Sequence, residues 1–238
     1  MKAKTRKTEK KPVHKTPRKK TKFIFPVACR LLQDLGEEGF ARICECMNAR
    51  ELHLKNKETF IVESDPCDRL GIVVTGAVRL TRQRIDGGRS VLETIQPNDT
   101  FGATYVFRDV KTMGISMSAV GETVVLLLDT SKITHPCHKA CFAHMQFLRN
   151  LLTIMSQKTF ALKQKLRILS QRTIRERLML FLHIRAKRDK SNEFDIPFDR
   201  QALADFLCVD RSALSAELSK LRAERKVESV KNHFKLIV

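Results

Sequence analysis

The sequence contains no run of apolar residues long enough to cross a membrane, since a spanning helix needs about 18 or more in succession. Residues 1–22 also lack the apolar segment of a secretory signal, and their many lysines and prolines distinguish them from Arg- and Ser-rich transit peptides. These two absences predict a cytoplasmic protein with no membrane partner. In that compartment the seven cysteines are expected to remain mostly reduced thiols rather than to form a disulfide framework.

Sequence signatures of catalysis are missing as well. The chain has no Gly-rich phosphate loop, no zinc-protease motif and no nucleophile elbow. An enzyme would need a nucleophile beside a base, or two paired carboxylates, in a pocket. We therefore do not expect an enzyme.

Acidic residues are scarce, with 26 Asp and Glu against 45 Lys and Arg, which gives a formal net charge of +19. The excess lies at the two ends of the chain, at +10 over residues 1–22 and +8 over residues 163–238. We interpret residues 1–22 as a disordered basic tail, which either adds non-specific DNA affinity or has no role. The second excess favours a nucleic-acid partner, because cations that meet phosphates release counterions.

Two short helical patterns lie between Asp199 and Arg222. The first follows Asp199, a residue suited to cap a helix, and ends at Cys208. The second follows another capping residue, Asp210. Apolar residues recur at helical spacing in both patterns: Ala202, Leu203, Phe206, Leu207, Leu214, Leu218 and Leu221. This spacing fits a helix-turn-helix, and it also fits an ordinary helical hairpin with a charged face.

The end of the chain favours the first alternative. Residues 226–238 alternate between apolar and polar positions around a turn near Lys231, which predicts a β-hairpin and hence a winged helix-turn-helix. In such a module the second helix enters the major groove with its first residues against base edges. Its exposed face would carry Arg211, Ser212, Ser215 and Ala216, and arginine suits two hydrogen bonds to guanine.

Residues 25–50 read as helical, and residues 52–129 as short strands separated by turn residues. One predicted strand ends at Gly76 and the next begins there, while Asp86-Gly87 marks a hairpin. Turn signals every 8–12 residues indicate a compact antiparallel β-barrel or sandwich. The predicted class is α+β.

After Pro136 the period becomes helical again. Seven residues alternate at spacings of four and three: Leu148, Leu152, Met155, Thr159, Leu162, Leu166 and Leu169. Such a heptad pattern predicts a coiled coil between two copies of the chain, or else a helix packed on the β domain. A second helix is expected over residues 172–188.

The order of these parts resembles that of the Crp/Fnr transcription regulators, over residues 25–238. Three segments carry the likeness: residues 71–80, Phe101-Gly102, and Arg200-Gln201 with residues 209–215. The resemblance implies an effector-sensing β-barrel of the cyclic-nucleotide-binding, jelly-roll type in residues 23–135. It further implies a dimerisation helix in residues 136–169 and a DNA-binding winged helix-turn-helix in residues 170–238. It also implies a homodimer that binds an inverted repeat in double-stranded DNA and contacts RNA polymerase.

The resemblance also assigns DNA-binding roles. It places Arg200 and Gln201 at a phosphate, and it places Arg211, Ser212 and Ser215 at base-reading positions. Ser212 replaces the glutamate common in the family, and Ala216 stands where an arginine often contacts a base. The operator is therefore not inherited from known members.

The effector site departs further from the family. Cyclic-nucleotide-binding members have Phe-Gly-Glu, followed ten residues after the glutamate by Arg-Ser or Arg-Thr. This chain has Phe101-Gly102-Ala103, with Met113-Gly114 ten residues on, so both charged ligands are missing. A cyclic phosphate without a cationic partner would be poorly held, and we expect no binding of cyclic AMP. The effector, small-molecule or redox, and any cofactor stay unassigned.

One cysteine-histidine patch is a candidate sensor. Cys137, Cys141 and His144 fall at i, i+4 and i+7 of a helix, so they would converge as metal ligands or a redox pair, or simply pack at the helix start. The cysteines at positions 29, 44, 46 and 67 lack the spacing of an iron–sulfur site. Two alternative functions remain open, a non-specific basic nucleic-acid-binding protein and a thiol or metal redox sensor without DNA output.

Overall fold

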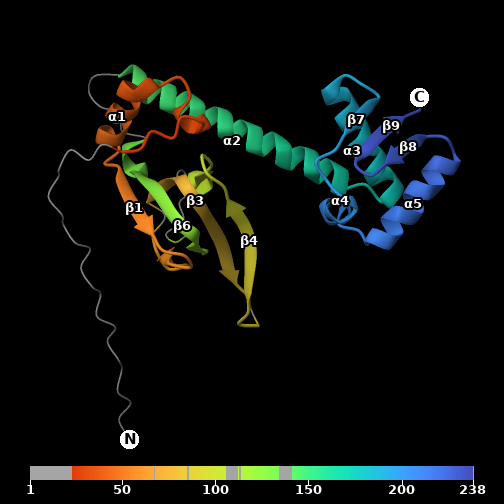
Figure 1. Cartoon of the computed structure of the whole chain (residues 1–238), viewed down its shortest axis with the longest axis horizontal. Helices are drawn as coiled ribbons and strands as arrows, with labels where there is room; N and C mark the ends of the chain where they lie inside the picture. Colours follow the sequence, from red (N-terminus) through yellow and green to blue (C-terminus); the bar gives the residue numbers. More distant parts are fainter. Residues whose placement is uncertain are drawn as a thin grey trace, which may run out of the picture. The chain divides into compact units, whose positions relative to one another are not determined.

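The computed structural model describes residues 23–66, 68–84, 86–105, 112, 114–133 and 141–237 (Figure 1). The expected tail at residues 1–22 and the candidate ligand Cys137 lie outside this set. The chain forms two compact units, Met1–Leu152 and Thr153–Val238, and the boundary between them falls within helix α2 (Phe142–Leu169). Among the described residues, no helix has the length and apolar character needed to cross a membrane.

The N-terminal unit consists of short helices followed by an antiparallel sheet (Figure 1). Its elements before α2 are η1 (Arg30–Leu32), α1 (Gly36–Cys46), β1 (Arg50–Leu54), β2 (Thr59–Ile61), β3 (Arg69–Gln83), β4 (Arg89–Ile95), β5 (Thr100–Phe101), η2 (Ala103–Tyr105), β6 (Ser116–Asp129) and η3 (Thr130–Lys132). The helix expected over residues 25–50 is shorter, because η1 and α1 are separate and β1 already begins at Arg50.

The sheet is built around its two longest strands, β3 and β6. Its strands follow the order β1-β6-β3-β4, while β2 pairs with β6 and β5 pairs with β3. Among the described strands β1 and β4 do not pair with each other, so the sheet is an open roll, of the jelly-roll type that was predicted. The predicted α+β class is confirmed.

The strand break predicted at Gly76 is wrong, since β3 runs without interruption from Arg69 to Gln83. Gly76 instead sits at a bulge, where the pairing of β3 with β6 shifts register between Val73 and Ala77. Its φ of +71° is in the left-handed region, and a side chain there would collide with Thr123 of β6. The residue read as a turn therefore bends a continuous strand.

Two of the segments that carry the family resemblance meet inside the roll. Gly71 of β3 pairs with Phe101 of β5, and the ring of Phe101 occupies the space that a side chain at Gly71 would need. Phe101 is 3% exposed and packs edge-on against Phe60. A glycine at position 71 is thus what allows the aromatic ring into the core of the roll.

Helix α2 buries one face of its first turns in the N-terminal unit. Phe147 and Leu151 are buried, and the amide of Asn150 donates hydrogen bonds to the carbonyls of Leu31 (3.1 Å) and Gln33 (2.7 Å). These two bonds satisfy carbonyls at the end of η1 and fix the helix on it.

The heptad positions of α2 lie largely on another face. Leu152, Leu162 and Leu166 are 63%, 68% and 69% exposed within the single chain. Exposed leucines repeated at this spacing are typical of a helix whose partner is another helix.

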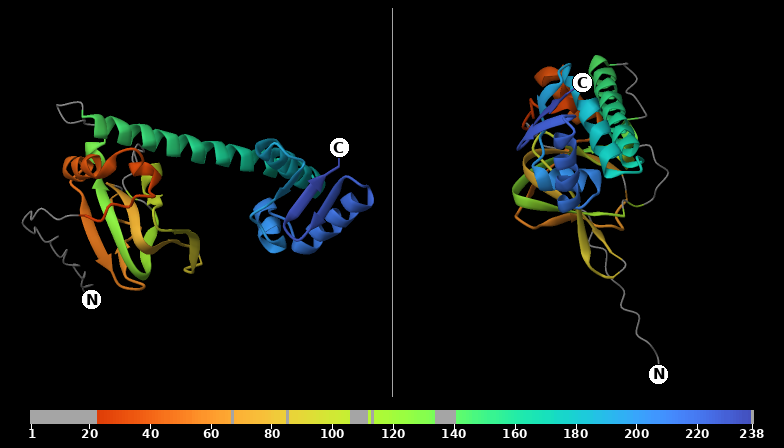
Figure 2. Two further views of the ribbon diagram at one scale, coloured as in Figure 1. Left: turned by 45° about the horizontal axis from the view of Figure 1, so that its top comes forward. Right: turned by 90° about the vertical axis from the view of Figure 1, so that its right-hand side faces the viewer.

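The C-terminal unit contains the end of α2, three further helices and a small sheet. Its elements after α2 are α3 (Ile174–Asp189), β7 (Glu193–Asp195), α4 (Arg200–Leu207), α5 (Arg211–Ala223), β8 (Val227–Val230) and β9 (His233–Leu236). The sheet has the order β7-β9-β8, and both of its pairings are antiparallel (Figure 2). The predicted terminal hairpin is confirmed as β8 and β9, whereas the strand β7 was not predicted from the sequence.

Candidate nucleic-acid interface

Helices α4 and α5 form the two helices of the predicted motif. The carboxylate of Asp199 accepts a hydrogen bond from the backbone N–H of Ala202 (2.7 Å), which confirms the predicted cap of α4. The helix stops at Cys208, whose φ of +54° is left-handed, and the tight turn that follows leads directly into α5. Asp210 begins α5 with its backbone carbonyl on the N–H of Leu214 (2.9 Å), but its carboxylate makes no capping bond, so its predicted side-chain cap is wrong.

Helix α5 has a fully buried face and an exposed face. Leu214, Leu218 and Leu221 have no exposed area and pack in the core of the unit. Arg211 and Ser212 are exposed and Ser215 is half-buried, so the predicted base-reading side chains lie away from the core. The three buried leucines fix the orientation of α5 about its own axis, and therefore which of its side chains face outward.

The exposed face of α5 carries small side chains beyond its first turn. Ala216, Ser219 and Ala223 are exposed, and the hydroxyl of Ser219 donates to the carbonyl of Ser215 (3.0 Å). Small residues let a helix backbone approach base edges closely. Ser219 lies seven residues after Ser212 on this exposed face and was not among the predicted contacts.

The two residues expected at a phosphate lie at the start of α4, and their side chains have different environments. The amide of Gln201 donates to the carboxylate of Asp205 one turn along the helix (2.9 Å) and is exposed. Arg200 lies over the ring of Phe234 of β9, at 5.7 Å from the ring centre, and donates from Nη2 to the carbonyl of Lys231 (3.3 Å). Arg200 is thus engaged by the β8–β9 hairpin, which we call the wing.

Two other arginines lie near Arg200. Partial burial lowers the pKa of its guanidinium, and the nearby charges of Arg222 and Arg211 lower it further. Among the described residues no carboxylate lies within ion-pair distance of Arg200. Three arginines therefore create a positive potential between α4, α5 and the wing, as an anionic ligand would require.

The turn of the wing was predicted near Lys231, and the structure places Lys231 in that turn. Lys231 has a φ of +52°, and it is exposed together with Val230. The next residue, Asn232, accepts a hydrogen bond from the N–H of Ile196 (2.9 Å) just ahead of α4. The sequence alone indicates an exposed charge at Lys231, whereas the attachment of the turn to Ile196 joins residues far apart in the chain.

A histidine on the wing joins two strands. The imidazole of His233 on β9 lies 3.1 Å from Asp195 through Nδ1 and 3.1 Å from Glu193 through Nε2, both carboxylates on β7. Only the doubly protonated ring donates to both, so these carboxylates raise the pKa of His233. Two cations also lie beside these residues. The ammonium of Lys235 is 4.0 Å from the carboxylate of Glu193, and the guanidinium of Arg185 donates to the backbone carbonyl of Asp195.

The free energy of unfolding of this unit is expected to fall as pH rises through the raised pKa of His233. A raised folded-state pKa stabilises fully below the unfolded value, near 6.5, and the contribution is lost above the folded value. Urea unfolding between pH 5.5 and 8.5, with an NMR titration of His233, would measure both quantities. His233→Gln should remove this part of the pH dependence, and His183→Gln, on α3, should leave it. A His233 pKa at or below 6.5 would contradict the pairing.

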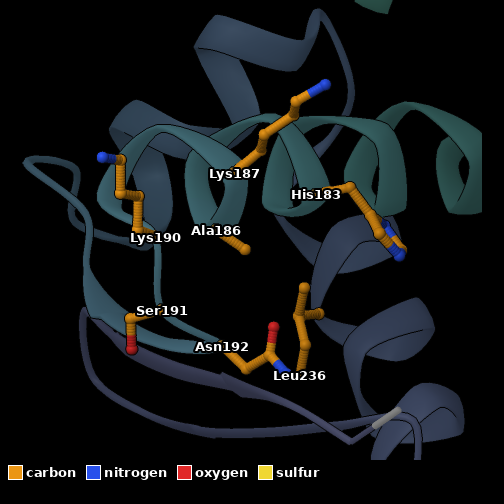
Figure 3. A pocket seen from close by; sticks show the side chains of 7 residues that line it. All are labelled: His183, Ala186, Lys187, Lys190, Ser191, Asn192 and Leu236. Atoms are coloured by element: carbon orange, nitrogen blue, oxygen red, sulfur yellow. The ribbon is translucent and has the colours of Figure 1, made fainter.

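A shallow pocket of about 370 Å³ lies elsewhere in the unit, between the end of α3 and the sheet. His183, Lys187, Lys190 and Asn192 are among its lining residues, and Figure 3 shows both lysine side chains extending away from the hollow. The charged groups therefore do not converge on a common ligand. We assign no function to this pocket.

The region expected to hold an effector has a buried, uncharged start. Gly102 has a φ of +82°, and a side chain there would collide with the carbonyl of Arg69 at 2.6 Å. Ala103, at the position of the family's glutamate, is 6% exposed in η2. Met113 lies outside the described residues, so of the two positions that differ from the family the structure describes only Ala103.

The cysteine-histidine patch is described in part. His144 is 2% exposed, and its Nε2 donates to the carbonyl of Ile133 (3.2 Å), while Cys141 is half-buried one turn earlier. Within the described ranges no group of three His, Cys, Asp or Glu side chains is arranged to hold a metal ion. The convergence of Cys137, Cys141 and His144 stays a prediction, because Cys137 lies outside those ranges.

Another cysteine of the N-terminal unit, Cys44, is buried. Burial raises the pKa of its thiol to about 12, which makes it a poor metal ligand or redox nucleophile.

A β-roll followed by a helical segment and a winged helix-turn-helix defines a class of DNA-binding transcription regulators. Residues 51–138 match the family described as the cyclic nucleotide-binding domain, and residues 176–238 match the Crp-like helix-turn-helix domain. The transcriptional activator protein FnrL of Cereibacter sphaeroides is 24% identical over 176 residues, covering 70% of this chain and 68% of that protein. The chain belongs to the Crp/Fnr family of transcription regulators.

The fold agrees with a solved structure of the same family. The catabolite activator protein of Thermus thermophilus is 20% identical, with a TM-score of 0.50 over 87% of this chain and 93% of that one. At this identity the comparison supports the fold alone. Members of the Crp/Fnr family act as transcription regulators and not as enzymes.

Proposed function

We propose that the chain is a homodimeric regulator that reads an inverted repeat in double-stranded DNA. Arg211, Ser212 and Ser215 would contact base edges, while Arg200 and Gln201, the first two residues of α4, would lie near a phosphate. The observation that carries the proposal is the division of α5 into three fully buried leucines and an exposed face of arginine and small residues. Exposed arginine at the first turn of a recognition helix is suited to guanine.

The proposed DNA-binding function also gives a role to each of the three segments of the chain. Residues 23–135 would act as the sensor, residues 136–169 as the dimerisation helix and residues 170–238 as the DNA-binding domain. The exposed leucines of α2 support pairing with a second copy, since the same helix of that copy would cover them. The dimer would work in the cytoplasm, where it would contact RNA polymerase and respond to a signal whose chemistry is unassigned.

Enrichment of random duplex DNA by the purified, reduced protein tests this function. We expect recovery of an inverted repeat with half-sites centred about 10 base pairs apart, or a multiple of that spacing. Binding without any preferred site, with a steep dependence on salt, would instead support a non-specific basic nucleic-acid-binding protein.

Cyclic AMP is expected not to bind at micromolar concentration. Ala103 replaces the acidic ligand of the family in a buried position, and the cationic partner of the cyclic phosphate is also absent from the sequence. Isothermal titration calorimetry would measure this, with a cyclic-AMP-binding relative as the positive control. A saturable micromolar isotherm with one site per chain would contradict the expectation.

A further inference from the structure

Arg200 is held by the wing through two contacts that leave little freedom to its guanidinium. The ring of Phe234 beneath it has no exposed area, and the carbonyl of Lys231 accepts its Nη2 hydrogen at 3.3 Å. A guanidinium that lies over an aromatic ring and donates a hydrogen bond from one edge is restrained by both contacts. The side chain at the start of α4 is therefore part of the support of the wing.

The same segment of chain anchors the other side of the wing turn. The N–H of Ile196 donates to the carbonyl of Asn232 (2.9 Å), and the amide of Asn232 donates back to the carbonyl of Ile196 (3.4 Å). Lys231, between these two attachments, has its carbonyl bonded to Arg200 while its own side chain is exposed. The turn is thus fixed to the chain just before α4 and to the first residue of α4.

We infer that Arg200 is a positioning residue, which orients the wing so that Lys231 binds a DNA phosphate. This inference rests on the proposed function. Because the carbonyl of Lys231 takes one edge of the guanidinium and the ring of Phe234 takes one face, Arg200 acts mainly through the wing. The exposed ammonium of Lys231 is then the group that releases a counterion.

A double-mutant cycle separates this role from a direct phosphate contact. The variants are Arg200→Gln, Lys231→Asn and their combination, and asparagine is chosen at position 231 because it tolerates the left-handed backbone there. Affinity for the duplex enriched by the wild-type protein is measured at several salt concentrations. Each single variant should lose about tenfold in affinity and reduce the slope of log K against log salt by about 0.9. The double variant should lose no more than either single one.

Matched controls isolate the effect of position. Lys57→Asn in the N-terminal unit removes the same charge from an exposed lysine that is also left-handed, at a φ of +67°. Arg89→Gln on β4 removes an exposed arginine remote in sequence from the wing. Both controls should leave affinity and salt slope unchanged.

Three results would overturn the inference while leaving the proposed function intact. Losses that multiply in the double variant, with a slope change of about 1.8, would show that Arg200 contacts a phosphate itself. Unchanged DNA affinity in Lys231→Asn would show that the wing turn does not contact DNA. Unchanged affinity in Arg200→Gln would show that Arg200 is not needed to position the wing. If Arg200→Gln does not fold, Lys231→Asn alone still tests the phosphate contact, since that side chain is exposed. Failure of the wild-type protein to enrich any duplex would instead count against the proposed function.

Discussion

A chain carrying both Leu162→Glu and Leu166→Glu should be a monomer and should lose about a thousandfold or more in affinity for its inverted repeat. Both leucines are largely exposed in the single chain, so glutamate there costs the monomer little. In a paired helix the same positions would face each other across the seam, where buried and repelling carboxylates are strongly unfavourable. Without the pair each half-site is bound alone, and affinity falls toward the non-specific level.

Sedimentation would report the mass, which should change from twice the chain mass of 27.3 kDa to that mass itself. Ala161→Glu adds a charge to the same helix at an exposed position off the seam and should stay dimeric. Thermal unfolding should show that the double variant still folds. A double variant that stays dimeric and keeps its affinity would refute α2 as the dimerisation helix.

The DNA-binding module was predictable because its signals are local. A capping aspartate, leucines at helical spacing and an alternating hairpin lie within 40 consecutive residues. Each of these has, in the folded chain, the structural role that its local pattern indicates. Asp199, Leu214 and Phe234 occupy the cap, core and sheet positions that their spacing indicates. Local consistency of this kind is typical of natural sequences.

The β-roll was predicted less accurately, because its decisive interactions join residues far apart in sequence. Gly76 resembles a turn glycine until it is paired with β6, which makes it a bulge in a continuous strand. Whether the sheet closes depends on whether β1 meets β4, and nothing in either strand alone decides that. Pairing between distant strands is a property of the whole sheet, so turn residues could not reveal it.

Side-chain direction was the least predictable feature of the interface. Arg200 matches a family position assigned to a phosphate, but its contacts with Phe234 and Lys231 arise from residues more than 30 positions later. The hairpin was predicted, yet its distance from α4 was not. Sequence patterns place a residue on an element, whereas its partner depends on packing between elements.

Arg211→Gln should weaken binding to the enriched duplex by about 1–3 kcal/mol and relax the preference at one base pair in each half-site. Arg211 is exposed at the first residue of α5, with no ion pair among the described contacts, so its guanidinium is free to take a guanine edge. Glutamine cannot reproduce two parallel donors to the same guanine. Competition against duplexes that carry each base in turn would locate the affected position.

The pattern of loss distinguishes base reading from simple charge attraction. Removal of a phosphate contact, as expected for Lys231→Asn, should weaken all duplexes about equally, whereas Arg211→Gln should weaken the preferred duplex most. Because Arg211 contributes nothing to the core, the midpoint of thermal unfolding should be unchanged. A uniform loss across all sequences would show that Arg211 neutralises a phosphate. The specificity of α5 would then have to come from the serine and alanine side chains of its exposed face.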